Sequence, residues 1–288
     1  MIKADVLYIG YPRSGSTYLR AYFRAHPQLN YDDQQIAELL YQPDFKPELI
    51  DKPDGKVYIS CDESIAESVC VTGRPETWGK YLYHPGCFNL VRHDLVIDPR
   101  EAARRMHKVH PNAKVLIIIR EQVDWFSSLY KATITSLPPG QRTFHDYWIT
   151  PQGIAMRAAA HHDLLIRAWR KLFVDVKVLR YERLMQSSHE LCEWFGVDHV
   201  PFPAKRVNES HAGLTAIHRR LGFLSRLPHG VKSALKPLTR FIPGKRSAAL
   251  FEEDKQMIRE LYKDSNRRTA VLLGEGTPVD FKLFTMPG

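Results

Sequence analysis

The sequence has few cysteines, and they follow no pattern. Only four of the 288 residues are cysteine, and no two of them form a CxxC pair; they are Cys61, Cys70, Cys87 and Cys192. Disulfide frameworks and zinc sites both need clustered or regularly spaced thiols. We therefore expect four reduced thiols and neither a disulfide framework nor a zinc site.

Long apolar runs are also missing. No uninterrupted apolar stretch approaches the ~20 residues that a membrane-spanning helix needs. A strand-like segment begins almost at once, at residues 5–10, which leaves no room for a signal peptide. The composition, 44% hydrophobic and 25% charged, is ordinary for a soluble globular protein. These features predict a cytoplasmic protein, and we expect one domain over residues 1–288.

Acidic residues are absent from one segment of the chain. Between Ser210 and Phe251 there is no Asp or Glu, whereas eight Lys or Arg residues occur there, out of a formal net charge of +9 for the whole chain. Such a segment is a solvated surface, a site for an anionic ligand, or an attachment to an anionic membrane surface. Pro228 and Pro237 divide it into short pieces. We expect a basic insertion or cap at about 211–249 within the single domain.

A phosphate-binding loop occurs near the N-terminus without its usual lysine. Residues 8–27, YIGYPRSGSTYLRAYFRAHP, run from an apolar strand through two glycines at P-loop spacing into a helical pattern. Backbone N–H groups of residues 15–17, at the start of that helix, favour a bound anion. Ser16 stands where nucleoside triphosphatases carry lysine, and the nearest cation is Arg13. Because that lysine neutralises the β- and γ-phosphates, its absence disfavours a kinase or ATPase.

Short apolar runs alternate with helical patterns along the chain. The expected strands cover 6–9, 57–61, 115–119 and 176–179, and the expected helices follow Gly15 and cover 100–109, 123–135, 154–173, 182–195 and 251–273. Runs of aliphatic residues are typical of strands buried on both faces of a parallel sheet. The alternation predicts an α/β fold with a central parallel sheet flanked by helices.

The loop sequence YPRSGSTYL, residues 11–19, resembles the 5′-phosphosulfate loop of sulfotransferases that use 3′-phosphoadenosine 5′-phosphosulfate (PAPS). The typical form in that family is YPKSGTTWL, with arginine as a variant of the lysine. The resemblance implies a P-loop-like three-layer sandwich and assigns PAPS binding to Arg13 and to the residues that follow it, Ser14, Gly15, Ser16, Thr17 and Tyr18.

A second element agrees with the first. KVLIIIREQVDWFSSLY, residues 114–130, is similar to the family's 3′-phosphate element, a strand-end arginine followed by Ser-x-Tyr. The resemblance assigns the 3′-phosphate to Arg120 and Ser128. Arginine suits this role because its guanidinium presents a fork of donors. The sequence EQVDW departs from the usual Asn-Pro-x-Asp-Arg, although Asp124 is kept.

Two shorter elements follow in the family's order. VLRYERL, residues 178–184, resembles a strand-to-helix turn in which a tyrosine approaches the adenine, and here Tyr181 takes that role or simply packs at a strand end. RVNES resembles a loop that closes over the nucleotide, which makes Arg206 and Asn208 candidate contacts. The resemblance spans roughly residues 5–210.

The family's reaction passes a sulfonate from PAPS to an acceptor by in-line displacement and leaves adenosine 3′,5′-bisphosphate (PAP), without a metal. It needs a cation at the bridging oxygen, donors around the sulfonate, and a base. Arg13 meets the first need, or it only anchors the phosphate. Glu63, two residues after Cys61, matches the glutamate base of heparan-type members. Its alternatives are Asp62, His93, or a structural role for Glu63 as an acid at a helix start.

The resemblance implies a hydroxyl or amine acceptor on a small molecule, natural product or carbohydrate, and no nucleic-acid partner. The sequence leaves the acceptor and the oligomeric state open. Aromatic residues line the acceptor pocket or, for most of them, form core; they are Trp78, Tyr81, Tyr83, Phe144, Tyr147 and Trp148. Two other functions stay in view: a divergent P-loop nucleotide kinase, and a non-catalytic nucleotide-binding protein attached through the basic segment.

Overall fold

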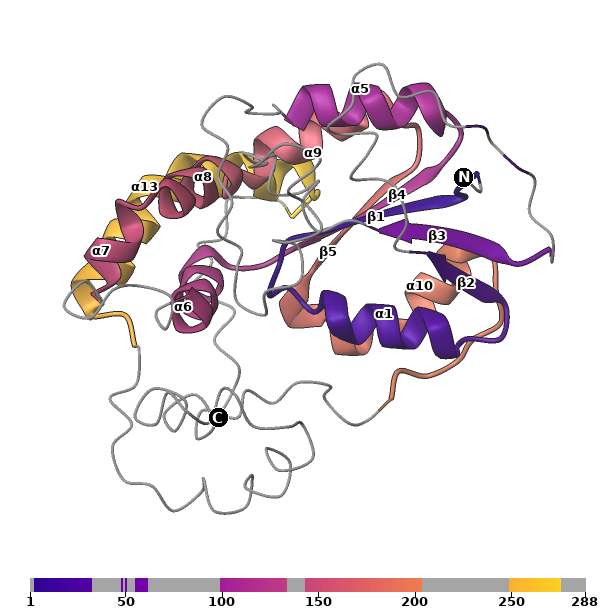
Figure 1. Cartoon of the computed structure of the whole chain (residues 1–288), viewed down its shortest axis with the longest axis horizontal. Helices are drawn as coiled ribbons and strands as arrows, with labels where there is room; N and C mark the ends of the chain where they lie inside the picture. The colour runs from indigo at the N-terminus through magenta and orange to yellow at the C-terminus, as the bar shows by residue number, and fades with distance from the viewer. Residues whose placement is uncertain are drawn as a thin grey trace, which may run out of the picture.

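The computed structural model describes most of the α/β framework of the chain (Figure 1). The described residues are 3–32, 48, 50, 55–61, 99–133, 143–203 and 249–275. The basic segment expected at 211–249 lies almost wholly outside these ranges. The single-domain organisation and the cap therefore stay predictions.

Five strands form one sheet in which every pair is parallel. In spatial order they are β2 (Leu29–Asp32), β3 (Val57–Cys61), β1 (Val6–Gly10), β4 (Lys114–Ile119) and β5 (Val176–Arg180). The predicted α/β fold with a central parallel sheet is confirmed. The short strand β2 was not predicted, although its sequence LNYD alternates apolar and polar residues, because the alternation extends over only four residues.

Helices cover both faces of the sheet and produce three layers (Figure 1). Alternate residues of each strand point to opposite faces. Leu7 and Ile9 belong to one buried cluster, together with residues of α5 (Pro99–Val109), α6 (Gln122–Thr133), α8 (Pro151–Ala159), α9 (His162–Arg170) and α13 (Glu252–Leu272). Val6 and Tyr8 belong to the other cluster, with α1 (Ser16–Ala25) and α10 (Ser188–Phe195).

Two predicted helices are divided in the structure. The helix expected over 154–173 is wrong as one element, because α8 ends before Ala160 and α9 begins at His162. Side chains of other elements take the carbonyls released there: the Tyr11 hydroxyl donates to Ala159 O, and Gln122 Nε2 donates to Ala160 O. The segment expected as a helix over 182–195 is a 3₁₀ helix, η1 (Tyr181–Gln186), followed by α10. The short helix α7 (Phe144–Trp148) was not predicted separately.

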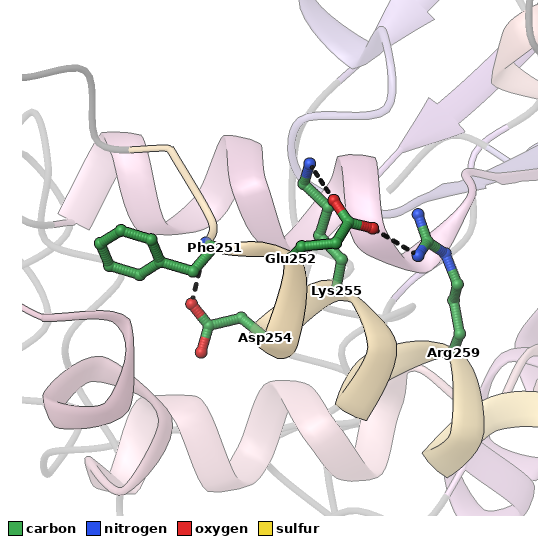
Figure 2. Close-up of polar contacts among 5 residues, drawn as sticks. All are labelled: Phe251, Glu252, Asp254, Lys255 and Arg259. Carbon is green, nitrogen blue, oxygen red and sulfur yellow. Dashed lines mark hydrogen bonds and ion pairs between the residues drawn. The ribbon is translucent and has the colours of Figure 1, made fainter.

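The last described helix, α13, begins with three acidic residues, of which Figure 2 shows Glu252 and Asp254. The Asp254 carboxylate accepts the Phe251 N–H at 3.1 Å, and Glu252 pairs with Lys255 at 3.0 Å and Arg259 at 2.9 Å. Acidic groups near a helix start are stabilised by the helix dipole. No helix in the described ranges is both long enough and apolar enough to span a membrane.

Candidate nucleotide-binding site

The loop after β1 begins with a tight turn that places Arg13 in an unusual conformation. The Ser14 N–H donates to Tyr11 O at 3.1 Å, which closes a four-residue turn with Pro12 and Arg13 at its centre. Arg13 has φ of 67°, and it is the only non-glycine residue with positive φ in the described part of the chain. A proline followed by a residue with positive φ is the pattern of a type II turn.

Gly15 follows that turn and starts α1 with φ of 85°. A Cβ at this position would lie 2.9 Å from Leu184 Cδ2 and 3.1 Å from Tyr181 Cε2. Both the positive φ and the close approach of η1 therefore require glycine. The Tyr181 ring, assigned by resemblance to the adenine, lies directly against the phosphate loop.

The Arg13 side chain meets the second predicted element. Its Nε donates to Ser128 Oγ at 3.2 Å, and Arg120 Nη1 donates to Arg13 O at 2.6 Å. These partners are 115 and 107 residues apart in the sequence. They meet because β1 and β4 are neighbours in the sheet, so that their carboxyl ends lie at the same edge.

Arg120 has no carboxylate partner among the described residues. Its guanidinium carbon lies 4.5 Å from the centre of the Tyr181 ring, and its buried Nε has no hydrogen-bond partner. A buried donor without a partner is costly, and a cation held on an aromatic face keeps its charge. Among the described residues Arg120 therefore presents a positive charge without an ion pair beside the loop, which suits an anionic ligand.

The loop hydroxyls differ in their surroundings. Ser14 is 0% exposed and its hydroxyl has no hydrogen-bond partner, Ser16 is also buried, and Thr17 is exposed. Tyr18 lies in the core, where its hydroxyl donates to Pro203 O at 2.8 Å. Ser14 thus offers a buried hydroxyl without a partner and Thr17 an exposed one, and the binding roles of the loop hydroxyls stay predictions. The Tyr18 hydroxyl is already used elsewhere, so a cofactor role for it stays a prediction.

Glu121 is a polar residue of the site that the sequence reasoning missed. Its carboxylate accepts the Asp124 N–H at 2.8 Å and so caps α6, while its own N–H donates to Glu182 Oε1 at 3.2 Å. Burial raises the pKa of this carboxyl, and the backbone N–H groups of Asp124 and Val123 that donate to it offset part of the rise. No local pattern identified it, because glutamate is not among the residues that are preferred at an N-cap.

A buried polar region formed by residues of α8, α9 and α13 packs against Tyr11 at the start of the loop. The Tyr11 hydroxyl donates to Ala159 O at 2.6 Å, and the Tyr11 ring lies 5.1 Å from that of His162. Burial, and then the charge of Arg180, lowers the pKa of His162 to about 3. Next to it Asp163, 0% exposed, accepts from Ser265 and from Arg268. The Arg268 guanidinium is exposed but already paired with the buried Asp163, so we interpret this region as structural support.

Several predicted residues lie outside the described ranges. They are the candidate base Glu63 with its alternatives Asp62 and His93, and the nucleotide contacts Arg206 and Asn208. The strand that precedes Glu63, β3, pairs with β1, and Cys61 stands opposite Tyr8. In the described part of the chain, no group of three or more His, Cys, Asp or Glu residues has the arrangement to hold a metal ion.

The aromatic residues of 144–148 belong to the core, as expected for most of the aromatic set. Phe144, Tyr147 and Trp148 are all buried, and the Trp148 ring lies 5.0 Å from that of Phe126. Trp78, Tyr81 and Tyr83 lie outside the described residues. Cys192 is buried and forms no disulfide with a described residue, and the reduced state of the four thiols stays a prediction.

Comparisons with known proteins give fold-level similarity only. No family model matches the chain, and no curated protein matches it. A sulfotransferase from Alicyclobacillus acidocaldarius aligns over 80% of this chain and 99% of its own, with 17% identity and a TM-score of 0.44. The sulfotransferase domain from the curacin biosynthetic pathway aligns over 91% and 97%, with 11% identity and a TM-score of 0.45. Values this low leave any assignment of function to the chemistry of the site.

Proposed function

We propose that the protein is a PAPS-dependent sulfotransferase that modifies a hydroxyl or amine of a small-molecule, natural-product or carbohydrate acceptor. The observation that carries the proposal is the meeting of Arg13, Ser128 and Arg120 at one edge of the sheet. The sequence resemblance assigns Arg13 to the 5′ end of the nucleotide and the other two to its 3′-phosphate. Their contact supports a single nucleotide that spans both elements.

Arg120 and Tyr181 would hold the 3′-phosphoadenosine end. The guanidinium of Arg120 keeps a buried Nε–H without a protein partner, and its charge has no described carboxylate beside it. A phosphate would accept from the fork of donors, and Ser128 would add a hydroxyl. This arrangement favours nucleotides that carry a 3′-phosphate over those that lack one.

Arg13 and the loop would hold the 5′-phosphosulfate. When bound, PAPS supplies an activated sulfonate and a phosphate leaving group. The exposed guanidinium of Arg13 would neutralise charge that develops on that leaving group, and the N–H groups at the start of α1 would donate to the phosphate. The loop has a serine in place of the usual lysine, which suits a bound phosphosulfate better than a triphosphate with magnesium.

Glu63 is the proposed base that takes the acceptor proton. Glu63→Gln should lower kcat by about 10²- to 10⁴-fold, because general-base catalysis contributes that much, while PAP affinity stays within about twofold. Single-turnover transfer from labelled PAPS and calorimetric titration with PAP measure the two quantities. Asp62→Asn is the matched control and should keep most of the turnover. Full turnover in Glu63→Gln would remove Glu63 from the mechanism.

Thermal unfolding with nucleotides tests the proposed function before any acceptor is known. PAP should raise the unfolding temperature in the presence of EDTA, and ATP should not do so more strongly when magnesium is added. Stabilisation by ATP that depends on magnesium would favour a kinase instead. A screen of candidate acceptors with labelled PAPS then distinguishes an enzyme from a protein that only binds the nucleotide, because only an enzyme transfers the label.

A further inference from the structure

The turn that carries Arg13 adopts a form that its sequence disfavours. Type I and type II turns follow the same chain path and differ mainly by a flip of about 180° of the central peptide, here the Pro12–Arg13 peptide. The type II form needs positive φ at its third residue, which suits glycine and is unfavourable for a residue with a Cβ. Arg13 nevertheless has φ of 67°. Some contact must therefore stabilise this orientation of the peptide.

That contact comes from Trp125 on α6. Its indole Nε1–H donates to the Pro12 carbonyl at 2.7 Å, and the ring is 1% exposed. The Pro12 carbonyl belongs to this central peptide, so a flip of the peptide would break the hydrogen bond from Trp125. The Trp125 ring also lies 5.0 Å from the ring of Tyr11, whose hydroxyl is anchored to Ala159 O. The indole therefore fixes Tyr11 and Pro12, the first two residues of the turn, against the core.

We propose that Trp125 is a positioning residue whose indole N–H locks the Pro12–Arg13 peptide in the type II orientation. This lock directs the Arg13 side chain toward Ser128, 3.2 Å away, and sets the direction of the Arg13 N–H. Because Trp125 is buried, it acts on a ligand only through the loop. Arg120, which holds the next carbonyl, does not replace it, since that bond fixes the far side of Arg13.

The lock can be tested without any ligand. In a type II turn the Pro12 Hα and the Arg13 amide proton lie close together, and in a type I turn they lie farther apart. The nuclear Overhauser effect between these protons should be strong in the wild-type protein and should weaken in Trp125→Phe. Trp169→Phe is the matched control: Trp169 is also buried, but its indole nitrogen has no hydrogen-bond partner. An equally strong signal in Trp125→Phe would overturn the proposal.

A second test measures the consequence for binding, and it rests on the proposed function. The 5′-phosphate increment is the ratio of the affinities for PAP and for adenosine 3′-monophosphate. Trp125→Phe should reduce this ratio on the order of tenfold, the value of one lost buried hydrogen bond, through weaker PAP binding alone. Trp169→Phe should keep the wild-type ratio. A parallel loss of affinity for both nucleotides would indicate general damage and contradict the lock.

Glycine at position 13 provides a further check. In Arg13→Gly the type II form needs no lock, because glycine adopts positive φ freely. Adding Trp125→Phe to that background should change the 5′-phosphate increment by less than about twofold. An undiminished tenfold effect in the double variant would show that Trp125 acts by another route.

Two provisions cover the cases in which Trp125→Phe does not fold or the protein does not bind the nucleotides. If Trp125→Phe does not fold, 3-benzothienylalanine at position 125 replaces the N–H with sulfur and keeps the shape of the ring, and the same outcomes apply. If the wild-type protein binds neither nucleotide, the proposed function fails, while the proton–proton measurement still decides the lock.

Discussion

Two arginines lie at the carboxyl ends of neighbouring strands, and the groups that contact their side chains differ. Arg120 follows β4 and Arg180 ends β5, where Ile119 and Arg180 are register partners. The Arg180 side chain is 5% exposed and pairs with Glu275, whose side chain is 23% exposed, through two hydrogen bonds. Arg120 lies on the Tyr181 ring, donates to a backbone carbonyl, and has no carboxylate partner in the described ranges.

The difference distinguishes a structural cation from the one that we propose binds a ligand. The Glu275 carboxylate neutralises the charge of Arg180 and ties the segment that follows α13 to the sheet. Removing either partner leaves the other charge unpaired in a partly buried place. Arg120 is held in place by the Tyr181 ring and a backbone carbonyl, and no carboxylate of the described residues pairs with it. Position at a strand end alone therefore does not identify a ligand-binding arginine; the charge of its neighbours does.

Replacing Arg180 should have the largest effect on stability. Arg180→Ala leaves Glu275 without its partner, and we expect about 3 kcal/mol less free energy of unfolding, the lower end for breaking a buried pair. Urea unfolding followed by circular dichroism measures it. Arg104→Ala, which removes an exposed ion pair with Glu101, is the control and should cost less than about 1 kcal/mol. Similar losses in both variants would mean that the Arg180 pair is no more than a surface contact.

The buried polar region of α8, α9 and α13, which lies beside Arg180, should make the stability of the protein depend on pH. His162 has its pKa lowered to about 3 by burial, so the unfolded state binds a proton below about pH 6.5 while the folded state does not. Stability therefore falls as the pH falls, and His162 alone should account for about 2 kcal/mol between about pH 7 and pH 5.

His162→Gln should remove that share of the pH dependence. The comparison uses unfolding free energies of the wild-type protein and the variant at both pH values. Part of the dependence should persist in the variant, because burial also lowers the pKa of His110, to about 4. An unchanged slope in His162→Gln would place the acid sensitivity outside the region around Arg180.

Removing the Tyr181 ring that contacts Arg120 should have the smallest effect, and that effect is on PAP affinity. Tyr181→Leu removes the ring beneath the guanidinium, and we expect PAP affinity to fall about fivefold, the value of a partly exposed cation–π contact. Tyr181→Phe keeps the ring and should keep the affinity. Titration calorimetry distinguishes them, and equal weakening in both variants would shift the role of Tyr181 to its hydroxyl.

The sequence predicted the framework well because local patterns determine it. The aliphatic runs of β1 and β4 predict strands buried on both faces, and nearly all of their residues are buried, whereas β5 is buried only at Leu179 and Arg180. The glycine turn before α1 marks the loop. The association of Arg13 with Arg120 and Ser128 came from family resemblance, and the parallel pairing of β1 with β4 gives it a physical basis.

Other features depend on contacts between distant segments, which no local pattern contains. The bond from Trp125 to the Pro12 carbonyl joins residues 113 positions apart, and nothing in the loop itself indicates it. The break between α8 and α9 likewise depends on side chains of Tyr11 and Gln122 that take the released carbonyls. Helical periodicity continues through this break, so the sequence predicted a single helix.

The most direct test of the central claim is calorimetric titration of the wild-type protein and Arg120→Ala with PAP and with adenosine 5′-monophosphate, in EDTA. If Arg120 is held ready for a 3′-phosphate, PAP affinity should fall about 100-fold in the variant, as expected when a charge-assisted pair is lost. Affinity for the monophosphate should change less than about threefold. Equal losses for both nucleotides, or wild-type binding that requires magnesium, would contradict the account.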